Sequence, residues 1–432
     1  MDLLGDLGDT DQLTSTRAEN EILKERLNVL QKKYNILAIE NESLKAEVEI
    51  YRSEAATSQS SSSTNSALDK AGTDTNQQLE MDHFIKSGDG TYAKSKSIEL
   101  NNCHGPANVL CCSLSNDDSV LATGGADRNI SLALWGNAFE QETTAEQVVE
   151  SSLRLNCDAP VIAIDFSRKG HNTNFVAASC MDGSVHVIYY EKSGRTLNAH
   201  EVAKGTIKHG KYVRSLAWSP SENILATGSA DGCVQIHKVV WNLIDPTDIV
   251  LEKIQNLQLS GPIESLCFRE DQLCCYARGS PSLQCFDLQD NFAQQKINLN
   301  KGPGNAGFDD HVSFAVMDMS PYGNDYMALA TDTSRNIIMD WKTGHHVRNL
   351  YGHKNDGYSQ PRLAWSNNGQ YIYGNSQTEN VVCVWDVASS SIVDRLESHS
   401  NTIRDMHSSK LTDTLVTTSF DKKTQFWLSS TD

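Results

Sequence analysis

Histidine, aspartate and cysteine are the residues of this 432-residue sequence whose chemistry could serve catalysis or metal binding. The 11 cysteines form no Cys-x-x-Cys pair, and the 13 histidines form no His-Glu-x-x-His motif. A Gly-x-Ser-x-Gly nucleophile motif and a phosphate-binding loop are also missing from the sequence. The glycine-rich segment 301–311, KGPGNAGFDDH, has no Lys-Ser/Thr after it and is interpreted as a surface loop. We therefore expect no catalytic residues, no metal and no cofactor.

Several of these residues instead recur along the chain. The turn VLATGGADR at 120–128 is nearly repeated as ILATGSADG at 224–232, which places Asp127 and Asp231 in equivalent turns. An aspartate in a tight turn accepts hydrogen bonds from nearby backbone N–H groups. The recurring histidines are His104, His209, His311, His353 and His399. A residue that recurs with a repeat serves the repeated structure, so we interpret these histidines as structural.

A second landmark precedes each turn. It is an apolar strand that ends in a bulky residue and serine, as in RSLAWSPSE at 214–222 and PRLAWSNNG at 361–369. Together the landmarks define seven units of roughly 40 to 50 residues, which is the period of a propeller blade. The units begin near His104, Asp158, His209, Gly261, His311, His353 and His399.

These repeats resemble the WD-repeat family, as in LATGSADGCVQIH and SHSNTIRDMHSSKLTDTLVTTSFDKKTQFW. The resemblance implies an all-β fold for residues 91–432, a seven-bladed propeller of four-stranded blades. It also implies a hydrogen-bonded set of His, Ser or Thr, Asp and Trp in each complete blade. The residues assigned to this set are His399, Thr417, Asp421 and Trp427 in the last blade, His353 and Trp385 in the sixth, His209, Thr227 and Asp231 in the third, and Asp127 in the first. The second, fourth and fifth blades depart from the pattern, with Ile188 at the tryptophan position of the second.

The ring must also close, because each blade needs a neighbour on both sides. Only LSSTD follows Trp427, so the last repeat lacks an outer strand of its own. Family propellers close by adding an N-terminal strand to the last blade. The segment TYAKSKSIEL at 91–100 is placed to do this.

Binding is the function that the resemblance implies, because family members hold peptides or other domains on their ring of loops. Aromatic and arginine side chains are the favoured anchors at such surfaces. The candidates near the loops are Arg128, Tyr212, Arg214, Tyr358, Arg404 and Phe420. Two alternatives remain: a substrate receptor of a cullin-type ubiquitin ligase, although WDVA at 385–388 lacks the arginine of the Trp-Asp-x-Arg motif, and a propeller-fold hydrolase.

The N-terminal region forms a separate device. Residues 1–12 are predicted to be an acidic flexible end, and residues 13–54 carry a heptad pattern typical of a parallel two-stranded coiled coil. The predicted dimerisation residues are Leu23, Leu27, Leu30, Leu37, Asn41, Leu44 and Val48. A homodimer is favoured by attractive flanking pairs such as Glu19–Lys24 and Glu40–Lys45, with a hetero-coil or a lone helix as alternatives. Residues 55–90, rich in Ser, Thr and Gln, are predicted to be a disordered linker.

The charge and composition of the sequence limit the classes of partner that we expect. The formal net charge of -18 argues against nucleic-acid binding, which needs clustered Lys and Arg. No apolar run approaches the roughly 20 residues of a membrane-spanning helix, so we expect no membrane insertion. Cysteines within apolar strand-like runs indicate reduced thiols in a cytoplasmic or nuclear protein. The sequence as a whole predicts a non-catalytic scaffold that dimerises and binds other proteins.

Overall fold

The computed structural model describes residue 24 and residues 86–429, apart from 136–144, 169–173, 194–195, 202–206, 242–248, 301–311, 324, 359 and 398. All the predicted dimerisation residues, and His311, lie outside these residues. The chain divides into two compact units, 1–74 and 75–432. The second unit contains the strands reported below.

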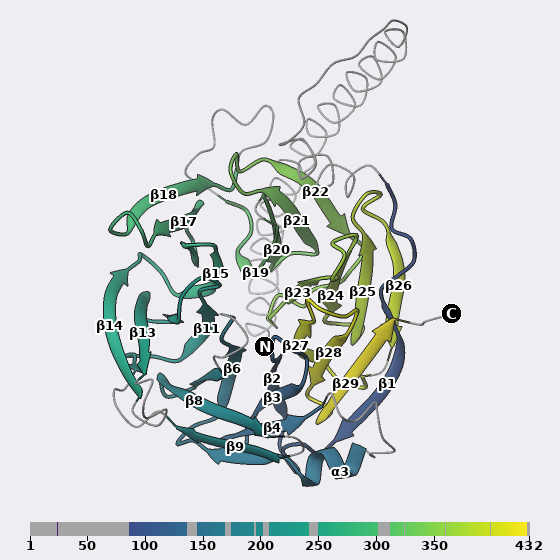
Figure 1. Ribbon diagram of the computed structural model, residues 1–432. Helices are drawn as coiled ribbons and strands as arrows, with labels where there is room; N and C mark the ends of the chain where they lie inside the picture. The colour runs from purple at the N-terminus through teal and green to yellow at the C-terminus, as the bar shows by residue number, and fades with distance from the viewer. Residues whose placement is uncertain are drawn as a thin grey trace, which may run out of the picture. The chain divides into compact units, whose positions relative to one another are not determined.

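Seven antiparallel sheets surround a common centre (Figure 1). From the innermost strand outward, blade 1 comprises β2 (Val109–Leu114), β3 (Val120–Gly125), β4 (Asn129–Leu134) and β5 (Leu153–Asn156), with α3 (Ala145–Glu150) between the last two; blade 2 comprises β6 (Val161–Phe166), β7 (Phe175–Cys180), β8 (Ser184–Ser193), β9 (Thr196–Glu201) and β10 (Ile207–Lys208); blade 3 comprises β11 (Val213–Trp218), β12 (Ile224–Ser229), β13 (Cys233–Trp241) and β14 (Ile249–Gln258).

The remaining blades follow the same order. Blade 4 comprises β15 (Ile263–Arg269), β16 (Gln272–Ala277), β17 (Ser282–Asp287) and β18 (Ala293–Asn298); blade 5 comprises β19 (Val316–Tyr322), β20 (Tyr326–Thr331), β21 (Arg335–Asp340) and β22 (His346–Tyr351); blade 6 comprises β23 (Leu363–Trp365), β24 (Tyr371–Ser376), β25 (Val381–Asp386) and β26 (Ile392–Glu397); blade 7 comprises β27 (Ile403–Ser408), β28 (Leu415–Ser419), β29 (Lys423–Ser429) and β1 (Ala93–Asn101). The predicted seven-bladed all-β propeller is confirmed.

Blade 2 elaborates the four-stranded plan. Its third strand, β8, pairs with β9 through Ile188–Ser193 and with β10 through Ser184 and Val185. Two short segments therefore share the outer position that a single strand occupies in the other blades.

Burial explains the composition of the strands. The second strand of several blades is buried along its whole length, as in β12 and β24, because each blade is covered by a neighbour on both faces. Outer strands such as β26 alternate between buried or half-buried residues and exposed ones, since one face meets solvent. The described residues form seven apolar clusters, and each cluster draws its residues from two adjacent blades. The core is thus a ring of interfaces between blades.

The tryptophan-serine landmarks lie at the end of innermost strands. Trp218 donates its Nε1–H to the carbonyl of Asp165, and Trp365 donates to the carbonyl of Ser320. Both acceptors belong to the preceding blade, so each tryptophan joins two neighbours. The serine that follows begins the next turn: the amide of Ser219 donates to the carbonyl of Ile224.

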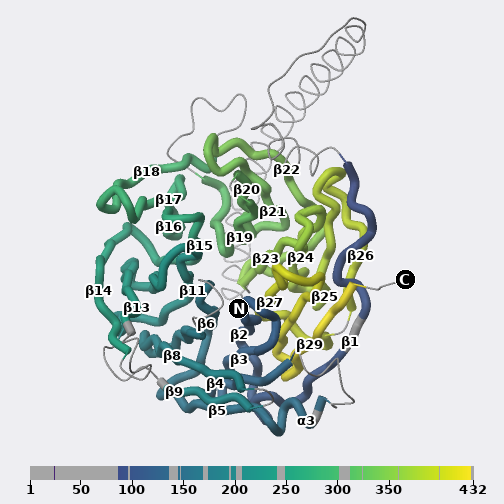
Figure 2. The backbone as a smooth tube through the Cα atoms, viewed as in Figure 1, coloured from purple at the N-terminus to yellow at the C-terminus, as the bar shows by residue number. Residues whose placement is uncertain are grey.

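Ring closure occurs as the sequence predicts. β1 pairs antiparallel with β29, with Leu100 opposite Thr424, and becomes the outer strand of blade 7 (Figure 2). Gln425 reinforces the pairing by donating from Nε2 to the carbonyl of Ile98. Within the segment assigned to the linker, the amide of Gly88 donates to Asp386 of blade 6 at 2.7 Å. Contacts with the propeller therefore begin before residue 91.

Candidate functional site

The turns after the second strands and the loops before the first strands lie at the same end of the blades. In six blades a turn residue donates its backbone N–H to the carbonyl of the residue just before the first strand. The pairs are Ala126–Asn108, Met181–Pro160, Ala230–Tyr212, Arg278–Pro262, Asp332–Ala315 and Phe420–Thr402. We call the surface formed by these turns and loops the loop face. Its backbone is pinned, so its side chains are presented in a fixed arrangement.

Blade 7 contains the complete predicted hydrogen-bonded set. Nδ1 of His399 lies 3.0 Å from Oδ2 of Asp421, and Nε2 lies 2.8 Å from the hydroxyl of Thr417. Trp427 donates its Nε1–H to the same hydroxyl at 3.2 Å. Burial tends to raise the pKa of Asp421, but the bond with His399 and those from backbone amides lower it overall. The set fixes the turn and the loop that meet on the loop face.

Blades 1 and 3 contain parts of this set. In blade 1, His104 lies 2.8 Å from Asp127 and 3.0 Å from the hydroxyl of Thr123, a residue that our sequence assignment did not include. In blade 3, Nε2 of His209 lies 2.7 Å from the hydroxyl of Thr227. Its Nδ1 is 4.0 Å from Asp231, too far for a hydrogen bond.

Asp231 still stabilises its own turn. The carboxylate accepts hydrogen bonds from the amides of Gly210 and Cys233. The next residue, Gly232, has φ +83°, and a Cβ there would lie 2.8 Å from the carbonyl oxygen of Leu259. In blade 3 the Asp-Gly pair therefore satisfies both the hydrogen bonding and the limited space of the turn.

Blade 6 uses its assigned residues differently. Trp385 donates its Nε1–H to the carbonyl of Tyr351, and the rings of His353 and Trp385 lie perpendicular to each other with centroids 5.3 Å apart. Glu379, at the turn, forms ion pairs with Arg395 at 2.8 Å and Lys354 at 3.0 Å. Burial lowers the pKa of His353 to about 4, which keeps the ring neutral.

Four of the predicted anchors form two pairs on the loop face. The guanidinium of Arg214 lies over the ring of Tyr212 at 5.5 Å, and that of Arg404 lies over Phe420 at 5.1 Å. Both arginines are the second residue of an innermost strand, where the pairing register shifts. They therefore stand at the inner rim of the loop face.

Glu264 occupies the same strand position in blade 4 and was missed by our sequence reasoning. Its side chain is 3% exposed and forms ion pairs with Arg214 and, at 2.7 Å, with Arg278. An acidic residue inside the apolar run IESLCF was the available signal. The carboxylate orients two arginines on adjacent blades.

The other two predicted anchors stand apart from these pairs. Tyr358 is 98% exposed, in the loop that leads into blade 6. Arg128 is exposed at the turn of blade 1 with φ +67°. Met181, at the turn of blade 2, is 50% exposed and was also missed. The loop face thus combines arginines held over aromatic rings with exposed apolar side chains.

Comparison with known protein families identifies the family of two of these repeats. Residues 96–132 and 194–238 match the family model of the WD domain, G-beta repeat. The chain is a WD-repeat protein. The two matched segments contain the His104 and His209 sets of blades 1 and 3. No curated protein matches the sequence.

The hub of the WD-repeat propeller contains a cavity of about 320 Å³ lined by the innermost strands. Arg362 lies beside it and forms ion pairs with Asp318 at 3.3 Å and Asp405 at 3.1 Å. The second oxygen of each carboxylate accepts a backbone amide of the next blade, from Leu363 and Cys112 respectively. These charges therefore join blades 5, 6, 7 and 1, and we assign them a structural role.

Two groups of metal-ligand atoms occur among the described residues. His209, Asp231 and Cys233 form one group, but the first two already belong to the blade 3 set, and the Cys233 thiol donates to Asn256. The other group is Cys157, Cys180 and His186. Among the described residues, no helix has the length and apolar character needed to cross a membrane.

Proposed function

We propose that this WD-repeat protein is a non-catalytic scaffold. Its coiled coil joins two chains, and the loop face of each propeller binds another protein. The observation that carries the proposal is the inner rim, where Arg214 and Arg404 lie over aromatic rings on backbone that is pinned by hydrogen bonds. Arginine and tyrosine held in this way lose little conformational freedom on binding, which suits them as anchors.

Two chains joined by a coil would bind a partner with two sites more tightly than one chain does. The second contact becomes intramolecular, and its strength depends on the reach of the segment between coil and propeller. We propose that the protein acts in the cytoplasm or nucleus. The support is that all 11 cysteines are buried and none forms a disulfide, which suits a reducing compartment.

Affinity purification with three forms of the full chain tests the proposal. The first is the wild type, the second carries Tyr212→Ala with Phe420→Ala, and the third is a control, Leu411→Ala. Leu411 is 61% exposed in the turn between the first two strands of blade 7, at the end opposite the loop face. We expect the double variant to capture about 30-fold less of the bound proteins, which corresponds to a loss of about 2 kcal/mol of binding free energy from the two anchors. The control should capture as much as the wild type.

Two outcomes would contradict the proposal. Equal capture by all three forms would move the binding surface away from the loop face. Capture dominated by cullin adaptors would favour the ubiquitin-ligase receptor instead. Deleting residues 1–54 separately tests the coil, because loss of bivalency should weaken capture without abolishing it.

A further inference from the structure

Blade 2 lacks the hydrogen-bonded set that blades 1, 3 and 7 use. Strand pairing makes the comparison direct: Val176 pairs with Ile188, as Leu225 pairs with His237 and Leu415 with Trp427. Ile188 therefore stands at the tryptophan position. Ala178 stands at the position of Thr227 and Thr417, so blade 2 has no hydroxyl there.

Cysteines and a histidine occupy the same region of blade 2. Cys157 lies four residues before the first strand, as His209 and His399 do in their blades. Cys180 ends the second strand, where Ser229 and Ser419 end theirs. His186, on the third strand opposite Ala178, takes the place of Gln235 and Gln425.

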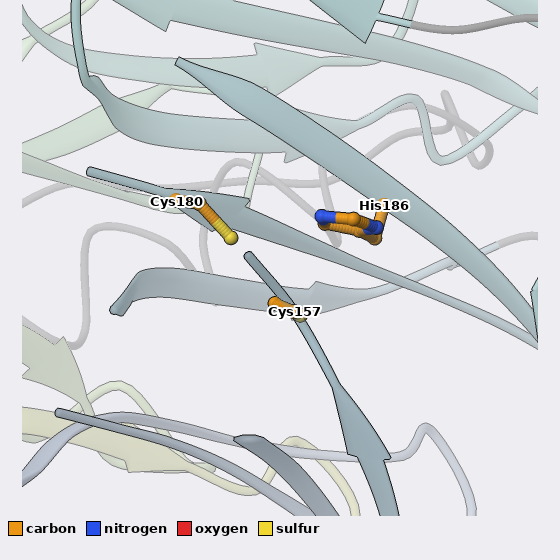
Figure 3. Close-up of side chains that lie close together, drawn as sticks. All are labelled: Cys157, Cys180 and His186. Atoms are coloured by element: carbon orange, nitrogen blue, oxygen red, sulfur yellow. The ribbon is translucent and has the colours of Figure 1, made fainter. Parts of the chain in front are cut away.

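Figure 3 shows the three side chains, with Cys180 and His186 on neighbouring strands of blade 2 and Cys157 on the loop that follows blade 1. Their ligand atoms all lie within 4.8 Å of one another. In a tetrahedral site with zinc–sulfur bonds of about 2.3 Å, two thiolate ligands lie about 3.8 Å apart. A small inward movement therefore brings all three atoms to bonding distance of one ion.

The backbone already holds the ligands in place. The amide of Cys157 donates to the carbonyl of Arg128 at 2.7 Å, and the carbonyl of Cys180 accepts the amide of Gly183 at 3.1 Å. Both cysteines belong to the apolar cluster between blades 1 and 2, and they are 3% and 0% exposed. The Ser184 hydroxyl lies 3.4 Å from Nε2 of His186 and adds a polar contact to the ring.

We propose that Cys157, Cys180 and His186 form a zinc-binding site that clamps blade 1 to blade 2. Two thiolates and an imidazole are a ligand set that Zn²⁺ prefers in a reducing compartment, and the fourth position is left for a water molecule. Each thiol that binds releases its proton to solvent. The ion takes the place of the hydrogen-bonded set of blades 1, 3 and 7, because Cys157 comes from the loop after blade 1 while Cys180 and His186 belong to blade 2.

Zinc content of the purified full chain tests the site. The reduced protein is stripped with a chelator, incubated with ZnCl₂, desalted and analysed by mass spectrometry for metal. We expect one zinc per chain in the wild type, and less than about a tenth of that in Cys157→Ser, Cys180→Ser and His186→Gln. The matched control is Cys233→Ser, which removes a thiol from the blade 3 group and should keep the zinc.

Two further measurements test the folding of the variants and the ligation of the metal. His186→Gln installs the residue that this chain uses at the same position in blades 3 and 7, so its circular dichroism should match the wild type. Titration with Co²⁺ should give thiolate charge-transfer absorption in the wild type and in Cys233→Ser only. Each of three results would overturn the proposal: no zinc in the folded wild type, equal zinc in a folded His186→Gln, or a Cys157–Cys180 disulfide in the freshly purified protein.

Discussion

Arg362 offers the sharpest test of how the hub is stabilised. Its side chain is 14% exposed and lies between the carboxylates of Asp318 and Asp405, which are 15% and 11% exposed. Replacing Arg362 with methionine keeps most of the volume but leaves two buried carboxylates without their cation. Breaking a buried ion pair in this way costs about 3–5 kcal/mol. With an unfolding entropy of about 2.1 cal/mol/K per residue for the segment 93–429, the expected loss is about 4–7 °C in Tm.

The pH dependence of the loss gives a second readout. Burial raises the pKa of both Asp318 and Asp405, and Arg362 opposes this rise. Without Arg362 both pKa values rise further above those of the unfolded chain. A raised carboxyl pKa favours folding at low pH, and that advantage is lost as pH rises through the folded pKa. The deficit of Arg362→Met should therefore shrink when the pH is lowered from 7 to 5.

Thermal unfolding followed by circular dichroism is the assay, with two companion variants. Adding Asp318→Asn and Asp405→Asn to Arg362→Met should restore most of the stability, since no uncompensated charge is left. Arg395→Met removes an exposed ion pair to Glu379 and should cost less than about 1 kcal/mol. The reasoning fails if Arg362→Met is no worse than Arg395→Met, or if its deficit is the same at pH 5 and pH 7.

Three other predictions follow from the same structure. Trp427→Ala should cost about 3–5 kcal/mol in unfolding free energy, through the cavity left in blade 7; an unchanged denaturation midpoint would contradict that packing. Burial first, and then Lys253, lowers the pKa of His209 to about 4, so this neutral histidine should contribute stability above pH 6.5 that is lost as pH falls toward 4. His209→Gln should flatten the pH dependence of Tm over that range. Leu30→Pro with Leu37→Pro should give monomers by light scattering and leave the Tm of the propeller unchanged; a surviving dimer would place self-association elsewhere.

Much of the fold was predictable because a propeller is periodic. Each blade repeats the same short strands and turns, so the repeated sequence identifies Asp127 and Asp231 as turn residues. The closing strand at 91–100 could also be predicted, since a ring of mutually covered blades must close and this segment precedes the first blade. Local hydrogen bonds and the burial of strands recur in each repeat. Comparing the sequences of successive repeats therefore locates the strands and turns.

The sequence by itself determined the number of blades, the strand that closes the ring and the hydrogen-bonded set of blade 7. Only the tertiary structure decided which side chains meet across blades. Glu264 reaches Arg214 over 50 residues, Arg362 joins Asp318 to Asp405, and Cys157 reaches Cys180 and His186 from the neighbouring blade. Such meetings depend on where the ring brings different repeats together, and a repeat pattern describes each blade without specifying what its neighbour presents to it.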